Sequence, residues 1–245
     1  MTLDEPVLSF RGVTRAFGHV TALDPVDLDV RRGEFVSIIG PSGCGKSTVL
    51  RLASGLDRPT AGEAIVRTRD VGYVFQDATL MPWRSVRRNV ELLGELTMVN
   101  RGNVRARAQQ ALETVGLVDF ADHLPRQLSG GMKMRASLAR SLVLEPDLFL
   151  FDEPFGALDE ITRMRLNLEL LDLFHERRFA AVFITHSVDE SVFLSDRVLV
   201  MSPRPGRIVA EFAVPFGRQR PPELRYEPRF AELAGRVART LQEVS

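Results

Sequence analysis

One short stretch near the N-terminus combines glycines, a lysine and three hydroxyl side chains at close spacing. Residues Gly40–Thr48 read Gly-Pro-Ser-Gly-Cys-Gly-Lys-Ser-Thr and satisfy the pattern G-x-x-x-x-G-K-[ST]. Glycines at these positions let the backbone curl so that successive N–H groups point at phosphate oxygens. The apolar run Phe35–Ile39 precedes the stretch and a helix is expected to follow, which is the context that the pattern requires. We therefore predict a phosphate-binding loop rather than an ordinary glycine-rich turn.

Individual side chains of this loop have separate tasks in such a site. Lys46 is expected to bridge the β- and γ-phosphates, and Ser47 to place its hydroxyl on Mg²⁺. The helix that starts here adds the positive end of its dipole. Cys44 is the one cysteine of the chain and is expected to be a small loop residue, with redox sensing as the alternative.

Two carboxylates follow a second apolar run. Leu148–Phe151 is typical of a buried strand, and Asp152 and Glu153 come directly after it. Such a strand delivers its last side chains to the edge of the sheet where the phosphate loop lies. Asp152 suits Mg²⁺, and Glu153, pointing the other way along the strand, could position or deprotonate an attacking water. The alternative is a strand that simply ends in solvated acids.

The bulk composition excludes several classes of partner and location. The 245 residues contain 32 basic and 32 acidic side chains, so net charge gives no support for binding DNA or an anionic membrane. A single cysteine indicates a reducing compartment. Residues 1–6 lack the basic start and apolar stretch of a signal peptide, and no apolar run approaches the roughly 20 residues of a spanning helix.

The hydrophobic pattern predicts an α/β fold with a parallel sheet, because strand-like and helical runs alternate. Strands are expected at 26–30, 35–39, 64–67, 71–75, 148–151, 181–185 and 197–201. Helices are expected at 48–54, 86–98, 104–115, 131–144, 160–177 and 229–244. Residues 203–228 are rich in proline and arginine and are expected to be loop or extended chain. We predict a nucleotide-binding core at 1–76 and 146–214, a helical insertion at 77–145 and a C-terminal appendage at 215–245.

A third motif narrows the family. Leu128–Met132 reads Leu-Ser-Gly-Gly-Met and lies between the phosphate loop and the acidic strand end. On its own it could be a helix N-cap with flexible glycines. With the other motifs it resembles the Leu-Ser-Gly-Gly-Gln signature of ABC ATPases, and the resemblance extends over about residues 7–210. It implies the P-loop ABC ATPase fold, which has a RecA-like core, a small antiparallel β subdomain and an inserted helical subdomain.

The resemblance also implies roles for single residues. Phe17 matches the aromatic residue that stacks on adenine, Gln76 the glutamine that senses Mg²⁺ and the attacking water, and His186 the histidine that contacts the γ-phosphate. Asp159 ends a stretch that resembles the D-loop. The implied catalytic residues are Glu153, His186 and Gln76, and the implied Mg²⁺ ligands are Ser47, Gln76 and Asp152. The implied ATP-binding residues are Phe17, Gly40, Pro41, Ser42, Gly43, Cys44, Gly45, Lys46, Ser47, Thr48, Ser129, Gly130, Gly131 and Asp159.

Three positions depart from the family pattern. Phe17 replaces the commoner tyrosine and keeps the ring that stacks. Met132 replaces the signature glutamine, and we expect this to be tolerated because backbone amides carry the chemistry. Met134 stands where most members have another glutamine, which removes a polar contact of the signature helix.

The family resemblance further implies partners. Two copies would pack head to tail so that each signature closes the ATP site of the other, at the cytoplasmic face of the membrane beside permease subunits. The segments 80–86, 155–160 and 204–208 look like the ATPases of nitrate, sulfonate and taurine importers, which also implies an indirect solute-binding partner and no nucleic acid. Trp83 lies where the family receives a helix of the permease; the alternative is an aromatic side chain packed into the insertion.

Two other functions remain open from the residues. A soluble ABC-type ATPase acting on nucleic acid or ribosomes would usually have two cassettes, a long coiled coil or zinc-binding cysteines, and this chain has none of these. A nucleotide sensor would not need Glu153 and His186. The sequence therefore favours a transport ATPase.

Overall fold

A six-stranded sheet forms the centre of the molecule. The computed structural model describes residues 5–97 and 101–244. The strand order is β5-β6-β7-β3-β8-β9, and all neighbours are parallel except β8 and β9. The strands are β3 (Phe35–Ile39), β5 (Val71–Val74), β6 (Leu148–Asp152), β7 (Ala180–Ile184), β8 (Arg197–Met201) and β9 (Ile208–Ala213). The α/β prediction is confirmed.

The central strands β3 and β7 consist almost entirely of apolar residues because both faces of the sheet are covered. Every residue of β3 and β7 is buried. Continuous apolar runs of this kind are typical of parallel strands between two layers, since neither face meets water. The parallel register then brings the carboxyl ends of β3, β6 and β7 to one edge of the sheet.

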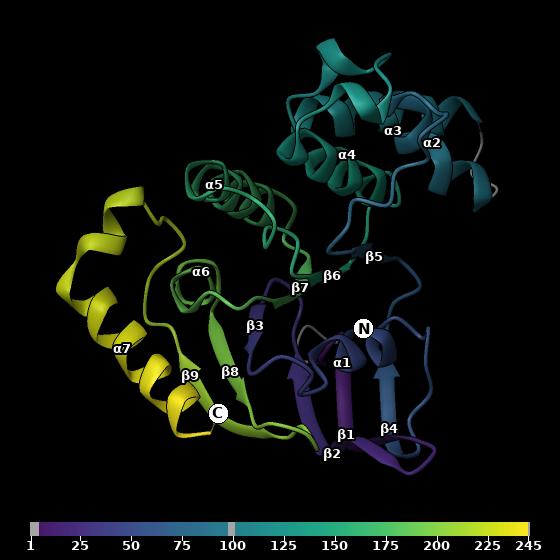
Figure 1. Ribbon diagram of the computed structural model, residues 1–245. Helices are drawn as coiled ribbons and strands as arrows, with labels where there is room; N and C mark the ends of the chain where they lie inside the picture. The colour runs from purple at the N-terminus through teal and green to yellow at the C-terminus, as the bar shows by residue number, and fades with distance from the viewer. Residues whose placement is uncertain (1–4, 98–100, 245) are drawn as a thin grey trace.

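A second, antiparallel sheet of three strands lies beside the first. Its order is β2-β1-β4, with β1 (Leu8–Phe17), β2 (Val20–Val30) and β4 (Ala61–Val66). Helix α1 (Lys46–Ala53) packs between the two sheets, because its side chains Val49 and Leu50 share a buried cluster with residues of both (Figure 1).

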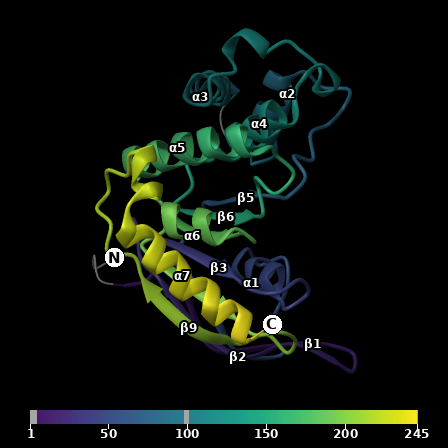
Figure 2. The same cartoon turned by 60° about the vertical axis from the view of Figure 1, so that its left-hand side comes forward.

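Three helices form a cluster beyond strand β5, which α4 contacts. They are α2 (Val86–Leu96), α3 (Arg101–Thr114) and α4 (Gly130–Leu142), with short 3₁₀ turns at Val118–Phe120 and Pro125–Gln127. They enclose an apolar core of their own, and Figures 1 and 2 show them grouped at one end of the molecule. The helix predicted at 86–98 ends at Leu96; its last predicted residue, Met98, lies outside the described residues. The domain boundaries drawn from the sequence stay predictions.

Helices α5 (Glu160–Arg177) and α6 (Val188–Leu194) cover one face of the central sheet, and α7 (Pro228–Glu243) lies over α6 and β8 (Figure 2). Phe230, Leu233 and Val237 of α7 are buried, as the helical spacing predicted. In the part of the chain that the structure describes, no helix is long and apolar enough to span a membrane.

Some local elements were not predicted from the sequence. Residues 203–228, expected to be loop or extended chain, include the strand β9, which pairs with β8, and a short 3₁₀ helix at Pro222–Tyr226. Strand β9 has no fully buried residue, which left little apolar signal in the sequence. Helix α6 was not predicted because it is short and follows β7 after a three-residue turn.

Candidate functional site

The phosphate loop joins the buried strand β3 to α1, as its sequence predicted. Gly45 at its end has φ +109°, and a Cβ there would lie 2.6 Å from the side chain of Leu23. Both facts require glycine. The loop therefore turns sharply enough to direct its amides to one side.

Lys46 lies within the curve of this loop. Its side chain is buried, and Nζ donates hydrogen bonds to the carbonyl oxygens of Gly40 at 2.8 Å and Pro41 at 2.9 Å. These bonds hold the ammonium group at the loop instead of in solvent. A cation placed here could neutralise bound phosphate.

Oxygen ligands that suit Mg²⁺ meet beside the loop. Ser47 Oγ lies 3.0 Å from Oδ1 of Asp152, the last residue of β6. Tyr73 on β5 donates a hydrogen bond to the other oxygen, Oδ2, at 3.3 Å. Burial, and secondly the Asp152 charge, raise the pKa of Tyr73, so this hydroxyl stays a donor. A hydroxyl and a carboxylate are hard oxygen donors, and the pair fits Mg²⁺.

Glu153 and His186 form a pair at the same edge of the sheet. His186 follows β7, and its Nε2 lies 2.6 Å from Oε1 of Glu153. The sequence predicted that Glu153 would point the other way along the strand, but β6 ends before it. The chain turns at Glu153 with φ +49°, a conformation uncommon for residues other than glycine. Such strained positions gather at functional sites. The turn aims the Glu153 carboxylate toward His186 instead of across the sheet.

One open cleft with a volume of about 600 Å³ is lined by Lys46, Ser47, Glu153 and His186. Phe17 enters it from the end of β1 and is 46% exposed, with the Arg15 guanidinium 4.3 Å from its ring centre. Gln76, after β5, is exposed and lines the cleft as well. The lining comprises Phe17, Val20, Ala22, Ser42, Gly43, Gly45, Lys46, Ser47, Thr48, Gln76, Glu153, His186 and Arg204. The cleft combines an aromatic ring, a phosphate loop and a carboxylate in the arrangement that ATP hydrolysis needs.

The other predicted site residues are not part of this lining: Gly40, Pro41, Cys44, Asp152, Ser129, Gly130, Gly131 and Asp159. Ser129 begins α4 and accepts a hydrogen bond from the Met132 amide at 3.3 Å, and Gly130 beside it is exposed. Asp159 begins α5, and its pKa is lowered because the Thr162 amide donates to its carboxylate.

These two helix starts adjoin each other. A Cβ on Gly130 would lie 3.4 Å from the side chain of Leu158, and one on Gly131 would lie 2.9 Å from that of Thr162. The signature and the D-loop stretch therefore share a surface of their own within one chain.

Arg204 also lines the cleft, although the sequence did not identify it as a site residue. Its guanidinium donates to the carbonyl oxygen of Gly43 at 3.1 Å from Nη2. Gly206 packs closely against the same loop: a Cβ at this position would lie 1.9 Å from the carbonyl oxygen of Cys44. The segment 204–208 was noticed in the sequence only as a subfamily resemblance, since nothing in its spacing indicates contact with a loop some 160 residues earlier.

A buried polar network lies behind His186. The hydroxyl of Thr185 donates to Glu190 Oε2, and the Asn167 amide, oriented to satisfy both neighbours, donates to Oε1 at 2.9 Å and accepts from Arg225 at 3.2 Å. Burial is the main cause that raises the pKa of Glu190. The network ties the turn that carries His186 to the segment before α7.

The exposure of two side chains, Trp83 and Met134, bears on what the sequence predicted for them. Trp83 is 74% exposed, so it is not packed into the helical cluster. Met134 is 6% exposed and packs in the main core with Phe155 and Leu166. A glutamine would leave its amide buried there, so methionine suits this chain's interior.

Comparison with known proteins identifies the family. The family model described as ABC transporter matches residues 23–156. A protein of Brucella abortus (strain 2308), named as ATP-binding, is 43% identical over 240 residues, covering 95% of this chain and 92% of the relative. An aliphatic sulfonates import ATP-binding protein of Burkholderia cenocepacia (strain HI2424) is 42% identical over 244 residues, covering 97% and 88%.

Solved structures agree with these sequence matches. The dimeric structure of a bacterial ABC transporter cassette matches with TM-score 0.76 and 32% identity over 86% of this chain and 100% of that one. A dimeric post-hydrolysis state of the same cassette with ADP and phosphate matches with TM-score 0.75, at the same identity and coverage. The protein cbiO1 of Clostridium perfringens, part of the ABC transporter complex cbiONQ, shares the fold, with TM-score 0.79 at 24% identity over 98% of each chain. The chain belongs to the ABC transporter family, as one of its ATP-binding and ATP-hydrolysing members.

Proposed function

We propose that this chain is the ATPase subunit of an importer, works as a head-to-tail dimer, and energises uptake of a small nitrate-, sulfonate- or taurine-type solute through permease subunits at the cytoplasmic face of the membrane. One observation supports the dimer: the cleft and the signature, each predicted to bind phosphate, are separate surfaces on a single chain. The exposed backbone amides at the start of α4 are suited to binding an anion. In the proposed dimer this anion is a phosphate of the ATP bound in the cleft of the other chain.

Within the cleft, each predicted residue has a task that follows from its position. Phe17 stacks on adenine, and the amides of residues 40–48 with Lys46 hold the phosphates. Glu153 accepts the proton of a water that attacks the γ-phosphorus, and His186, hydrogen-bonded to it, keeps the carboxylate aimed at that water.

Ser47, Asp152 and Gln76 would hold Mg²⁺, which supplies charge neutralisation of the β- and γ-phosphates when bound. The 3.0 Å contact between Ser47 and Asp152 places two of these ligands together without the ion. ADP and phosphate are the products.

The second copy would supply Ser129, Gly130, Gly131 and Asp159 to this cleft. The dimeric cassettes among the solved relatives support this arrangement. A pair of chains would then hold two composite sites, each made from one cleft and one signature.

The permease would dock beside Gln76, where Trp83 is exposed. Aromatic side chains are enriched where proteins bind one another, and the largely exposed indole of Trp83 is available for such a contact. The named relative that imports aliphatic sulfonates supports both the importer and the class of solute, and does not favour a soluble ATPase acting on nucleic acid or ribosomes.

Mixing two inactive variants tests the composite site. Lys46→Ala damages a cleft and Gly130→Asp damages a signature, so each homodimer lacks every intact site. A mixed dimer regains one, because the intact cleft of one chain meets the intact signature of the other. We expect mixing to restore phosphate release. Failure of mixed dimers to hydrolyse ATP, with both chains folded and dimeric, would contradict the proposal.

Reconstitution tests the importer. The chain expressed with a candidate permease from the same organism should copurify with it and drive ATP-dependent accumulation of a sulfonate into proteoliposomes. A chain that instead hydrolyses ATP only on addition of RNA or ribosomes would overturn this proposal.

A further inference from the structure

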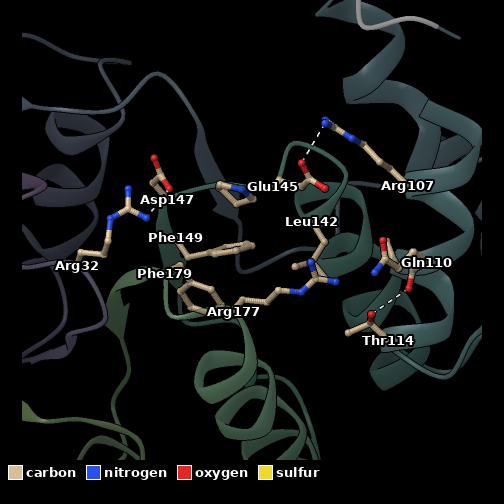
Figure 3. A pocket seen from close by; sticks show the side chains of 12 residues that line it. Arg32, Arg107, Gln110, Thr114, Leu142, Glu145, Asp147, Phe149, Arg177 and Phe179 are labelled. Carbon is tan, nitrogen blue, oxygen red and sulfur yellow. Dashed lines mark hydrogen bonds and ion pairs between the residues drawn. The ribbon is translucent and has the colours of Figure 1, made fainter. Parts of the chain in front are cut away.

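A second cavity, of about 190 Å³, lies at the opposite edge of the central sheet from the ATP cleft. Arg32 precedes β3, residues 145–147 precede β6, and Phe179 precedes β7, so this part of its wall sits at the amino ends of strands whose carboxyl ends carry the ATP site. Arg107 and Gln110 of α3 close it from the helical cluster. The cavity therefore lies at the joint between the core and that cluster (Figure 3).

The walls of this joint cavity carry more positive than negative charge. Arg32 pairs with Asp147 at 2.8 Å, and Arg107 pairs with Glu145 at 2.9 Å. Arg177 is the third arginine of the lining; its ion pair is with the exposed Glu176, which does not line the cavity, and this contact is long, at 3.7 Å. One positive charge thus remains uncompensated by the carboxylates of the wall.

The other side of the joint cavity is apolar. Phe149 and Phe179 pack with ring centres 4.6 Å apart, and Pro146 and Leu142 complete this wall. Figure 3 shows the Arg177 side chain extending from α5 past the two rings, with its guanidinium near Leu142 and Gln110. A cation beside an apolar wall selects a ligand that has an anionic group and a hydrocarbon body.

We propose that this cavity binds a small organic monoanion, a carboxylate or sulfonate on a short apolar body. Arg177 takes the anionic group, with Gln110 as a neighbouring amide donor, and the hydrocarbon lies against Pro146, Phe149 and Phe179. The volume equals that of about six liquid waters at ~30 Å³ each, which suits a short organic anion. Because the walls come from α3 and α4 on one side and the core on the other, a bound anion holds the two together.

Titration of the nucleotide-free chain with 1-butanesulfonate, butyrate and inorganic sulfate tests the site. Methyl NMR signals of Ala111 and Leu142, which line the cavity, report binding there. We expect both organic anions to shift these signals with a Kd on the order of 1 mM, and sulfate to bind at least about tenfold more weakly because it has no apolar body. Equal binding of sulfate would overturn the proposal.

Matched variants test whether Arg177 provides the positive charge that binds the anion. Arg177→Gln and Gln110→Glu should each raise the Kd for butanesulfonate about tenfold or more, the first by removing the cation and the second by adding a like charge. Arg178→Gln removes the same charge from the next residue, which does not line the cavity, and should bind as the wild type does. Wild-type affinity in Arg177→Gln, or an equal loss in Arg178→Gln, would show that no such site exists. The result is independent of ATP hydrolysis and of transport.

Discussion

His186 Nε2 lies 2.6 Å from Glu153 Oε1, although the two residues follow different strands. Neighbouring parallel strands β6 and β7 place them there, and the left-handed turn at Glu153 completes the approach. A general base held by a second side chain keeps its orientation toward the water it deprotonates.

Glu153→Gln should retain ATP affinity and lose steady hydrolysis by about 100-fold or more, because the amide accepts no proton. Phosphate release and nucleotide titration measure the two effects. With ATP the variant should also remain dimeric in size-exclusion chromatography. Glu232→Gln, on the exposed side of α7, is the matched control and should hydrolyse normally. Full turnover by the Glu153 variant would remove this residue from catalysis.

Lys46→Ala should raise the Kd for ATP about tenfold to a hundredfold, the range expected for loss of charge-assisted hydrogen bonds to phosphate. Calorimetric titration measures this. Lys133, the other lysine of the sequence, lies outside the cleft, so Lys133→Ala should bind ATP with unchanged affinity. Unaltered affinity in the Lys46 variant would contradict the assignment of the phosphate loop.

Gly206→Ala should destabilise the fold by about 1–3 kcal/mol and weaken ATP binding, because the new Cβ meets the Cys44 carbonyl oxygen of the phosphate loop. Chemical denaturation and nucleotide titration would show both effects. The control is Gly217→Ala, where a Cβ meets nothing within 4 Å. If the two variants behave alike, the loop at 204–207 does not support the ATP site.

Glu190→Gln should change the pH dependence of stability. Burial raises the pKa of Glu190 above its unfolded value, so its contribution is fully present below that unfolded value and is lost as pH rises through the folded pKa. The free energy of unfolding of the variant, minus that of the wild type, should therefore increase as pH rises from about 4.5 to 8, which means that the variant gains relative stability. Urea denaturation at several pH values measures the difference. A difference that stays constant with pH would show that Glu190 titrates normally.

Trp83→Ala should leave ATP binding and folding unchanged, because the side chain is largely in solvent. It should weaken copurification with the permease about tenfold or more, as removal of a central aromatic contact does. Tyr226→Ala, at a similarly exposed aromatic residue far along the chain, is the matched control. Equal loss in both variants would exclude a specific docking surface at Trp83.

The sequence by itself determined the local chemistry of this protein. The phosphate loop, the acidic pair and the strands that carry them were predictable, because buried parallel strands and glycine-rich turns depend on residue types close together in the chain. The α/β class and the helical face of α7 followed from hydrophobic periodicity. Strand β9 and helix α6 were missed, since a half-buried edge strand and a seven-residue helix have too little periodicity.

Only the tertiary structure decided which distant groups meet. Arg204 reaches Gly43 across the fold, Glu153 leaves its strand to pair with His186, and Ser129 is kept outside the cleft that its own chain forms. The physical reason is that sheet register, turn geometry and helix packing fix distances between residues far apart in the sequence, whereas residue patterns constrain only their neighbours.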